Sequence, residues 1–278
     1  MRRYAVALAL VGMMSEASAN PFELPTLRGT NSFVSQSQTY HPRWEGIYGG
    51  VHWGYNSAGM NFANSASEII AYLLRNTTEN EELQVSSWTV LDKQRTSNTL
   101  LGGFIGYNFQ WESIVLGIEA YYSRGKLNAI STDTMARFQD VDSIRYSVSL
   151  TAGASISIAD LGGVRTRIGY ANGWFLPYAT FGVAIGRGDI SRFVTITETE
   201  TDITDPLNPI PLGGLGTITR AEDERNRWFY GYSAGLGMDI MLMQNLFVRG
   251  EWEYMQFPSV SGIGITINSA KVGAGIKF

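Results

Sequence analysis

Cysteine is absent from this 278-residue chain, and histidine occurs only twice. The absence of cysteine excludes disulfide bonds and also excludes a lipid anchor on a cysteine after export. His41 and His52 have no sequence neighbours that would complete a catalytic triad or a metal site. The composition therefore predicts a protein that is not an enzyme and that holds no cofactor and no metal.

Charged residues and long apolar runs are also scarce. Charged side chains make up 17% of the chain, against roughly 25% in soluble domains. The net charge is −4 and no basic block occurs, which argues against nucleic-acid binding, because that affinity depends on neutralising phosphates. Beyond the N-terminus no run of about eighteen apolar residues is present, which excludes a helical membrane protein.

The N-terminus has the three parts of an export signal. Arg2 and Arg3 supply the positive charge, residues 4–14 form a short apolar run, and Ala17-Ser18-Ala19 provides small residues for cleavage. The apolar run is too short to cross a bilayer as a helix. The sequence therefore predicts a signal peptide over residues 1–19.

Period-two alternation over long segments is the dominant pattern of the remaining chain. Residues 228–242 carry apolar side chains at every second position from Trp228 to Leu242, opposed by small or polar residues such as Gly231, Ser233 and Asp239. Alternate side chains of a strand point to opposite faces. Such a length exceeds a typical soluble strand of about five or six residues and suits a tilted membrane-spanning strand.

Seven further segments follow the same pattern. They are residues 44–55, 99–109, 114–123, 164–170, 175–187, 248–254 and 272–278. Short connections of a few residues alternate along the chain with long polar stretches, as in barrels with periplasmic turns and external loops. The sequence thus predicts an all-β fold, an eight-stranded antiparallel up-and-down transmembrane β-barrel with long extracellular loops, over residues 44–278. Residues 20–43, which are polar and contain three prolines, are expected to form a flexible periplasmic segment.

Aromatic residues gather at the predicted strand ends, as expected for girdles at the two membrane interfaces. Those beside the long loops are Trp53, Tyr55, Tyr121, Tyr122, Trp228, Tyr230, Trp252, Tyr254 and Phe257, and those at the opposite ends are Phe109, Trp111, Trp174, Phe175, Phe247 and Phe278.

Three alternating segments lie outside this count of strands. Residues 144–158 would make the strand number odd if they crossed the membrane, so we expect a strand above it, as part of a hairpin in the second loop. Residues 193–204 and 216–224 flank a tip rich in proline and glycine and are expected to form a second outward hairpin.

Charged residues on the predicted inner face are the main candidate functional residues. They are Glu119, Arg165, Arg167, Asp239, Arg249, Glu251, Glu253, Lys271 and Lys277. An eight-stranded barrel has an interior that side chains can fill, and buried acids and bases are expected to pair. We therefore favour a salt-bridged plug, and a narrow conducting pore is the alternative.

Several blocks of sequence resemble a known family. They are WEGIYGGVHWGY from Trp44, GGFIGYNFQWESIVLGIEAYYS from Gly102, VRTRIGYANGWFLPYATFGVAIG from Val164, GYSAGLGMDIMLMQNLFVRGEWEYMQF from Gly231 and the terminal KVGAGIKF. These blocks resemble the porin-like small outer-membrane β-barrel family of Gram-negative bacteria, whose best-known members are alphaproteobacterial surface antigens. The resemblance implies an OmpA-like barrel in the cell outer membrane. It also implies an assembly signal formed by Val272, Ala274, Ile276 and Phe278.

Three functions stay open on the sequence alone. The first, which we favour, is a structural and surface-interaction barrel with a filled lumen and exposed loops. The second is a narrow small-solute porin, and the third is a lipid-modifying enzyme built on a His–Ser pair. The expected partners are outer-membrane lipid and lipopolysaccharide, the barrel-assembly machinery, and host or phage surface molecules that would contact the loops.

Overall fold

The computed structural model describes residues 42–278, apart from residue 76 and residues 89–90. The predicted signal peptide, and all but the last two residues of the predicted segment 20–43, lie outside the described residues. The strands are β1 (Gly46–Asn61), β2 (Lys93–Trp111), β3 (Ile114–Val141), β4 (Ile144–Tyr170), β5 (Phe175–Asp202), β6 (Ile210–Met241), β7 (Leu246–Val260) and β8 (Ile263–Lys277).

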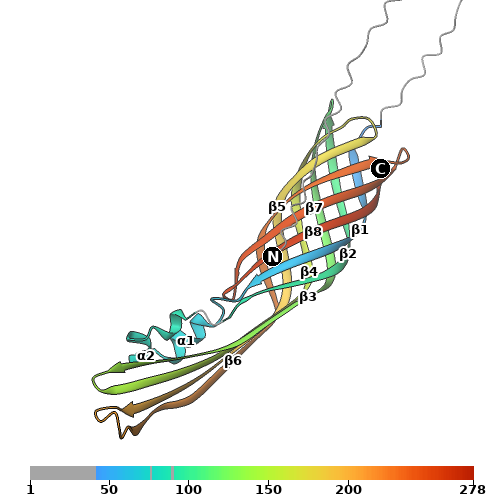
Figure 1. The fold of residues 1–278 in the computed structure, drawn as a ribbon. Coiled ribbons are helices and arrows are strands. Elements are labelled where there is room, and N and C mark those ends of the chain that lie inside the picture. The colour runs from blue at the N-terminus through green and yellow to red at the C-terminus, as the bar shows by residue number, and fades with distance from the viewer. Residues whose placement is uncertain (1–41, 76, 89–90) are drawn as a thin grey trace, which may run out of the picture. The chain divides into compact units, whose positions relative to one another are not determined.

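The eight strands close into a barrel in which each strand pairs with the next, and β8 pairs with β1 (Figure 1). Every pairing is antiparallel. Connections of two to four residues join β2 to β3, β4 to β5 and β6 to β7 at one end of the barrel. The predicted eight-stranded up-and-down topology is confirmed.

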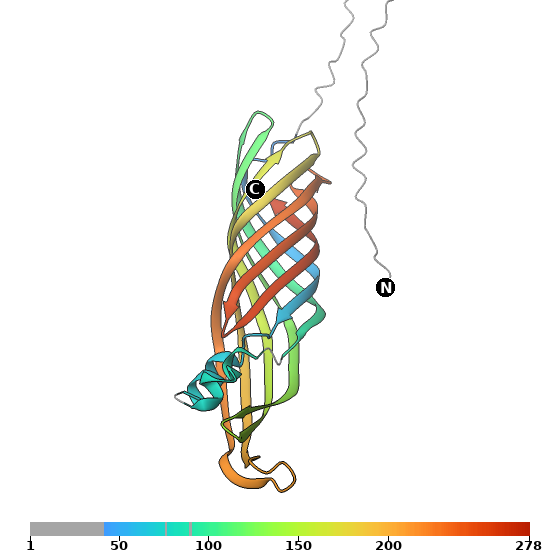
Figure 2. The same ribbon diagram turned by 60° about the vertical axis from the view of Figure 1, so that its left-hand side comes forward.

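Two of the predicted long stretches consist largely of strand, and residues 193–204 and 216–224 pair as the expected second hairpin. β3 and β4 run on to a tight turn at Asp142 and Ser143, whose φ angles are 48° and 65°. β5 and β6 reach 28 and 32 residues and meet at a tip over residues 203–209. Residues 144–158 form the outer half of β4 and pair with β3, as expected for a hairpin. Figure 2 shows β3 to β6 continuing beyond the barrel, and we call this four-stranded part the extension.

Register shifts at one common level separate the barrel from the extension. The shifts fall between Arg124 and Leu127 on β3, between Ile158 and Asp160 on β4, and between Gly188 and Ile190 on β5. A single extra residue in a strand exchanges its two faces. On β4, Val164 faces outward below the shift, whereas Ile156 and Ile158 are buried above it. The exchange fits the surroundings, because apolar side chains face lipid inside the membrane and must turn inward in water.

The connection from β1 to β2 carries short helices where the sequence suggested only a polar loop. They are α1 (Ser67–Leu73), α2 (Thr78–Glu81) and the 3₁₀ helix η1 (Val85–Ser87). Ile70, Val85 and Trp88 are buried in one apolar cluster with the inner face of the extension. We call this cluster the outer core. Figure 1 shows the helices beside the extension.

No helix in the described part of the chain is long and apolar enough to cross a bilayer.

The outward face of the barrel is apolar, as the alternation predicted. Leu101 and Val51 are 65% and 63% exposed on this face. The outward apolar side chains include Ile105, Leu116, Ile118, Ile168, Phe181, Val183, Leu236 and Val272. Such a band suits contact with lipid.

Most girdle aromatics face outward, but three do not. Tyr121, Phe247 and Phe257 are buried, at 5%, 2% and 0% exposure. Tyr121 and Tyr122 are consecutive, so only one of them can face lipid, and Tyr122 does. The girdle prediction was wrong for these three residues because it considered only their position at strand ends and not which face of the strand they occupy.

Candidate functional site

The end of the lumen beside the short turns, which we call the inner end, is closed by packed aromatic side chains. Trp44, Tyr48, Phe104 and Phe247 are buried together. The ring centroids of Tyr48, Phe104 and Phe247 lie 6.2 Å from one another, and that of Trp44 lies 6.3 Å from Phe247. Gly275 faces these rings at a point where no side chain would fit, because a Cβ atom there would lie 2.4 Å from the ring of Phe247. Small residues on the inner face of β8 therefore make room for large rings from neighbouring strands.

A buried charge network lies within the barrel, and eight of the nine predicted residues belong to it. Its acids are Glu119, Asp239, Glu251 and Glu253, and its bases are Arg165, Arg167, Arg249 and Lys271. None of these residues is more than 7% exposed. Four acids face four bases, so the lumen carries no net charge from this network.

Arg165 on β4 joins three acids of the network. Its guanidinium donates to both carboxylate oxygens of Glu251, at 2.8 and 2.7 Å. It also donates to Glu119 at 2.5 Å and to Glu253 at 3.1 Å. Its planar group lies over the ring of Tyr121, 4.8 Å from the centroid. Arginine suits such a position because its fixed fork of donors can hold several carboxylates at once.

Arg249 on β7 is the second branching point. It donates to the two oxygens of Asp239 at 2.8 and 3.1 Å and to Glu119 at 2.7 Å. Arg167 donates to Asp239 at 2.7 Å, and Lys271 pairs with Glu253. Glu119 thus accepts hydrogen bonds from both Arg165 and Arg249. The network ties together β3, β4, β6, β7 and β8.

Lys277 is the predicted residue that the structure leaves out of this network. Its ammonium donates to the backbone oxygen of Glu45 at 3.2 Å. Lys277 is the last residue of β8 and Glu45 directly precedes β1, so the contact lies at the barrel end where the network's carboxylates do not reach. The prediction that Lys277 joins the charge network was wrong because alternation gives the face of a residue but not its depth.

Two tyrosines complete the network and were missed in the sequence. The Tyr48 hydroxyl donates to Glu119 at 2.9 Å, and the Tyr178 hydroxyl donates to Glu251 at 2.9 Å. The guanidinium of Arg167 lies 3.8 Å from the centroid of the Tyr178 ring. Both tyrosines occupy inward positions of their strands, so the alternation could have identified them.

His52 lies beside Ser123 inside the lumen. Its Nε2 is 2.8 Å from the Ser123 hydroxyl, and both residues are buried. The imidazole stacks against Phe104 with centroids 6.1 Å apart. The pair is therefore enclosed by the barrel wall and faces away from lipid. In the described residues no group of three or more histidine, aspartate or glutamate side chains is arranged to hold a metal.

Arg192 connects the extension to its neighbours, and nothing in the sequence pattern marked this residue as functional. Its Nη1 donates to the backbone oxygens of Ser65 and Ser261, at 3.1 and 3.0 Å. Its Nη2 donates to Glu222 at 2.9 Å and to Glu224 at 3.4 Å. One side chain of β5 thus connects β6, the helical connection and the β7–β8 turn, and we call these contacts the Arg192 clamp.

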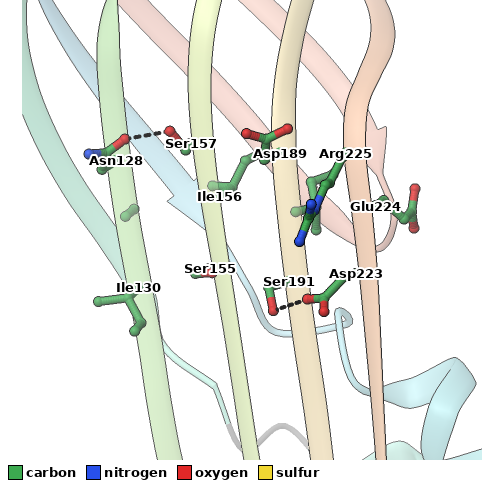
Figure 3. A pocket seen from close by; sticks show the side chains of 12 residues that line it. Asn128, Ile130, Ser155, Ile156, Ser157, Asp189, Ser191, Asp223, Glu224 and Arg225 are labelled. Atoms are coloured by element: carbon green, nitrogen blue, oxygen red, sulfur yellow. Dashed lines mark hydrogen bonds between the residues drawn. The ribbon is translucent and has the colours of Figure 1, made fainter.

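The outer face of the extension is hollowed and carries polar side chains together with a few exposed apolar ones, such as Ile130. A groove of about 480 Å³ crosses β3 to β6 just above the register shifts (Figure 3). Asn128 and Ser157 hydrogen bond at 2.7 Å, and Ser191 donates to Asp223 at 2.5 Å. Both hydrogen bonds join side chains of neighbouring strands, β3 to β4 and β5 to β6.

The residues of the predicted assembly signal lie on the lipid-facing side of β8. Val272, Ile276 and Phe278 are 58%, 49% and 77% exposed, and Ala274 is exposed between them. The backbone nitrogen of Phe278 donates to the oxygen of Ile47 at 2.8 Å, which holds the C-terminus against β1. The role of these four residues in assembly stays a prediction.

Comparison with known proteins agrees with this architecture. A family model described as "Outer membrane protein beta-barrel domain" matches residues 5–278. The "25 kDa outer-membrane immunogenic protein" of Brucella ovis is 24% identical over 179 residues, which cover 64% of this chain and 62% of the relative. The "22 kDa outer membrane protein" of Rhizobium leguminosarum bv. viciae is 28% identical over 183 residues, 63% of this chain and 64% of the relative. The matched part thus spans less than two thirds of each relative.

Two solved structures align with most of the chain at low similarity. OprG from Pseudomonas aeruginosa is 13% identical, with 86% of this chain and 98% of that chain covered and a TM-score of 0.39. Ail from Yersinia pestis is 12% identical, with 84% and 99% covered and a TM-score of 0.33.

Proposed function

The chain belongs to the family of outer membrane protein β-barrel domains, and from this we propose that it is a plugged barrel that anchors a surface-exposed recognition structure. Its place is the cell outer membrane. In this proposal the barrel is a non-catalytic, non-conducting support, and the extension with its helices carries the contacts outside the cell.

The charge network is the observation that carries the proposal of a plugged lumen. Arg165 and Arg249 reach acids on opposite strands, so their contacts cross the interior. Beneath them the rings of Trp44, Tyr48 and Phe247 fill the inner end. A conducting path would have to break several buried ion pairs at once, and each broken pair leaves an uncompensated charge that costs about 3–5 kcal/mol.

Planar-bilayer recording of the refolded protein tests the plugged lumen. The parent is expected to give no reproducible conductance steps. A variant with alanine at Arg165, Arg249, Glu119 and Glu251, which keeps the charge balanced, and also at Tyr48 and Phe247, is expected to conduct because the crossing charges and the rings at the inner end are both gone. Reproducible steps from the parent would refute the plug and favour the narrow porin.

The extension supports the proposed surface role. Its tip exposes apolar side chains, with Leu207 at 89%, Ile210 at 60% and Leu212 at 50% exposure. Exposed apolar side chains at a projecting tip are typical of contact sites for other macromolecules. The Brucella relatives are named immunogenic, which agrees with exposure to the outside. Host or phage surface molecules are the partners that we propose for this end.

Cell-surface labelling tests the proposed exposure. A cysteine introduced at Leu207 would be the only cysteine of the chain, and a membrane-impermeant maleimide should label it in intact cells. A cysteine at Glu112, in the β2–β3 turn, is the matched control and should be labelled only after the cells are broken. Equal labelling of both positions would contradict the proposal.

The enclosed position of His52 and Ser123 disfavours the lipid-modifying alternative. Both side chains face the lumen, and an ester of a membrane lipid would have to pass the barrel wall to reach them. If His52→Ala changes the lipid composition of the host outer membrane, the non-catalytic part of this proposal is wrong.

A further inference from the structure

A row of charged and aromatic residues crosses the outward face where the barrel meets the extension. Backbone pairing places Arg124 opposite Asp160, Asp160 opposite Arg187, and Arg187 opposite Trp228. Arg187 donates to Asp160 at 2.9 Å from Nε and approaches it at 2.7 Å from Nη2. The Arg124 Nε lies 3.9 Å from the same carboxylate. Four strands thus present one continuous row of side chains.

Asp160 holds this row in place. It is 5% exposed although it lies on the outward face, because its neighbours cover it. The Tyr122 hydroxyl donates to it at 2.5 Å. The carboxylate therefore fixes Arg187 through two contacts, while the side chain of Arg124 stays 75% exposed. Arginine side chains fixed in this way lose less conformational freedom when they bind an anion.

A cleft of about 290 Å³ lies at this row. Gly162 and Gly163 line it and leave space between the rings of Tyr122 and Trp228. Both rings belong to the outer aromatic girdle and are 50% and 56% exposed. Girdle aromatics lie at the level of lipid head groups. The cleft therefore opens at the boundary between acyl chains and head groups of the outer leaflet.

The row at the cleft carries an excess of positive charge. Arg124 and Arg187 stand against Asp160, so two positive charges face one negative charge. The groove above the cleft differs, because Asp189, Asp223 and Glu224 line it together with one base, Arg225. The whole chain, by contrast, has a net charge of −4. A basic cluster at the head-group level attracts anionic lipid groups. Arginine in particular matches the oxygens of phosphate and carboxylate.

We propose that this cleft binds the anionic glycolipid of the outer leaflet, lipopolysaccharide. Arg124 and Arg187 bind the charged group on the lipid's sugar head, and the apolar floor beside Ile185 contacts the start of an acyl chain. The inference rests on the outer-membrane location and not on the plugged lumen.

Binding of a fluorescent rough lipopolysaccharide to the protein in zwitterionic nanodiscs tests the proposal. The variant Arg124→Gln/Arg187→Gln should bind it about tenfold more weakly for each arginine removed, since one charge-assisted contact is worth roughly that factor. Arg75→Gln/Arg145→Gln removes the same charge from sites away from the cleft and should bind like the parent. Heat-modifiable gel migration verifies that each variant is folded.

Two further probes identify the group that is recognised. The dephosphorylated form of the same lipid should bind the parent more weakly, and its affinity should change little between the parent and Arg124→Gln/Arg187→Gln. The lysine variant Arg124→Lys/Arg187→Lys should recover part of the affinity. Equal binding by the parent and the double glutamine variant would overturn the proposal. Equal competition by phosphatidylglycerol would overturn it as well, because it would show a site for any anionic lipid. Neither result depends on conductance, so this inference and the plugged lumen can fail separately.

Discussion

Arg165 on β4 and Glu251 on β7 form a two-point ion pair across the lumen, with both guanidinium amino groups donating to the two carboxylate oxygens at 2.8 and 2.7 Å. The two residues are 86 positions apart in the chain, and both are buried. The pair fixes the distance between two strands that are not neighbours in the barrel. Its loss should therefore affect the whole barrel rather than one edge.

Charge reversal of Glu251 should destabilise the barrel strongly. Glu251→Lys removes a partner of Arg165 and places a second positive charge beside it, so we expect a loss of about 3–5 kcal/mol or more in the free energy of unfolding. Urea titration in lipid vesicles, followed by heat-modifiable gel migration, measures this. Glu82→Lys, an exposed change in the helical connection, is the control and should cost less than about 0.5 kcal/mol. Equal midpoints for the two variants would show that the network does not brace the barrel.

Loss of the Arg192 clamp should loosen the helical connection and leave the barrel intact. Arg192→Ala removes bonds to the backbone oxygens of Ser65 and Ser261, each a bond from a charged donor worth roughly 1.5–3 kcal/mol. Trypsin cleavage after Arg75 should become about tenfold faster or more, while the barrel fragment stays resistant. Arg95→Ala, an exposed substitution on β2, should leave the rate unchanged. Unaltered cleavage of the Arg192 variant would mean that the outer core alone holds the helices.

The clamp should weaken in acid through Glu224. Burial alone would raise the pKa of Glu224, but hydrogen bonds from Ser261 and Arg227 and the charge of Arg192 lower its pKa overall. A lowered pKa in the folded state means that the carboxylate stabilises the fold above its ordinary pKa of about 4.3 and that this stabilisation is lost as the pH falls below it.

Hydrogen exchange of the β7–β8 turn as a function of pH measures this contribution. After correction for the intrinsic pH dependence, amide protection near Ser261 should fall as the pH is lowered through about 4. In Glu224→Gln the same amides should be less protected at neutral pH, and the step near pH 4 should be missing. A step of equal size in the variant would assign the effect to another group.

The C-terminal residue should matter for assembly in cells more than for folding in detergent. Phe278 is 77% exposed and packs little against the barrel, so Phe278→Ala should refold in detergent with nearly the parent's yield. In cells we expect severalfold less folded protein in the outer membrane, if the terminal aromatic is what the assembly machinery recognises. Phe175→Ala, another exposed aromatic at the same end, is the control. Similar folded levels of the parent and the Phe278 variant in cells would refute the predicted signal.

The alternation along each strand predicted much of the fold. From Trp228 to Leu242 it identified the lipid-facing positions, and at Arg165, Glu251 and Lys271 it identified the lumen-facing charges. These assignments succeeded because the direction of a side chain in a strand follows from its position alone. Tyr121 and Phe257, which were predicted in the girdle, are buried, because their positions in the alternation place them on the inner face.

The sequence did not predict how far along the barrel axis an inward residue lies, or which residue it pairs with. Lys277 and Lys271 occupy the same face of β8, yet Lys271 pairs with Glu253 and Lys277 binds the backbone of Glu45. Which residues of neighbouring strands lie opposite these two lysines depends on how the strands are shifted relative to one another. The sequence of one strand does not give that shift. The register shift at Asp160 likewise turned the apolar face of β4 inward, and the sequence, which predicted two outward hairpins, did not predict that they would pair with each other into one sheet.

The amino-acid sequence is enough to predict that alternate residues of eight long strands face lipid and that the remaining ones fill a polar interior, because side-chain direction in a strand is a local property. The folded barrel was needed to show which charges meet, how far the strands continue beyond the membrane, and that Arg124, Asp160 and Arg187 form one row. Those outcomes depend on the relative stagger of strands far apart in the chain, and closure of the barrel fixes that stagger for all strands together.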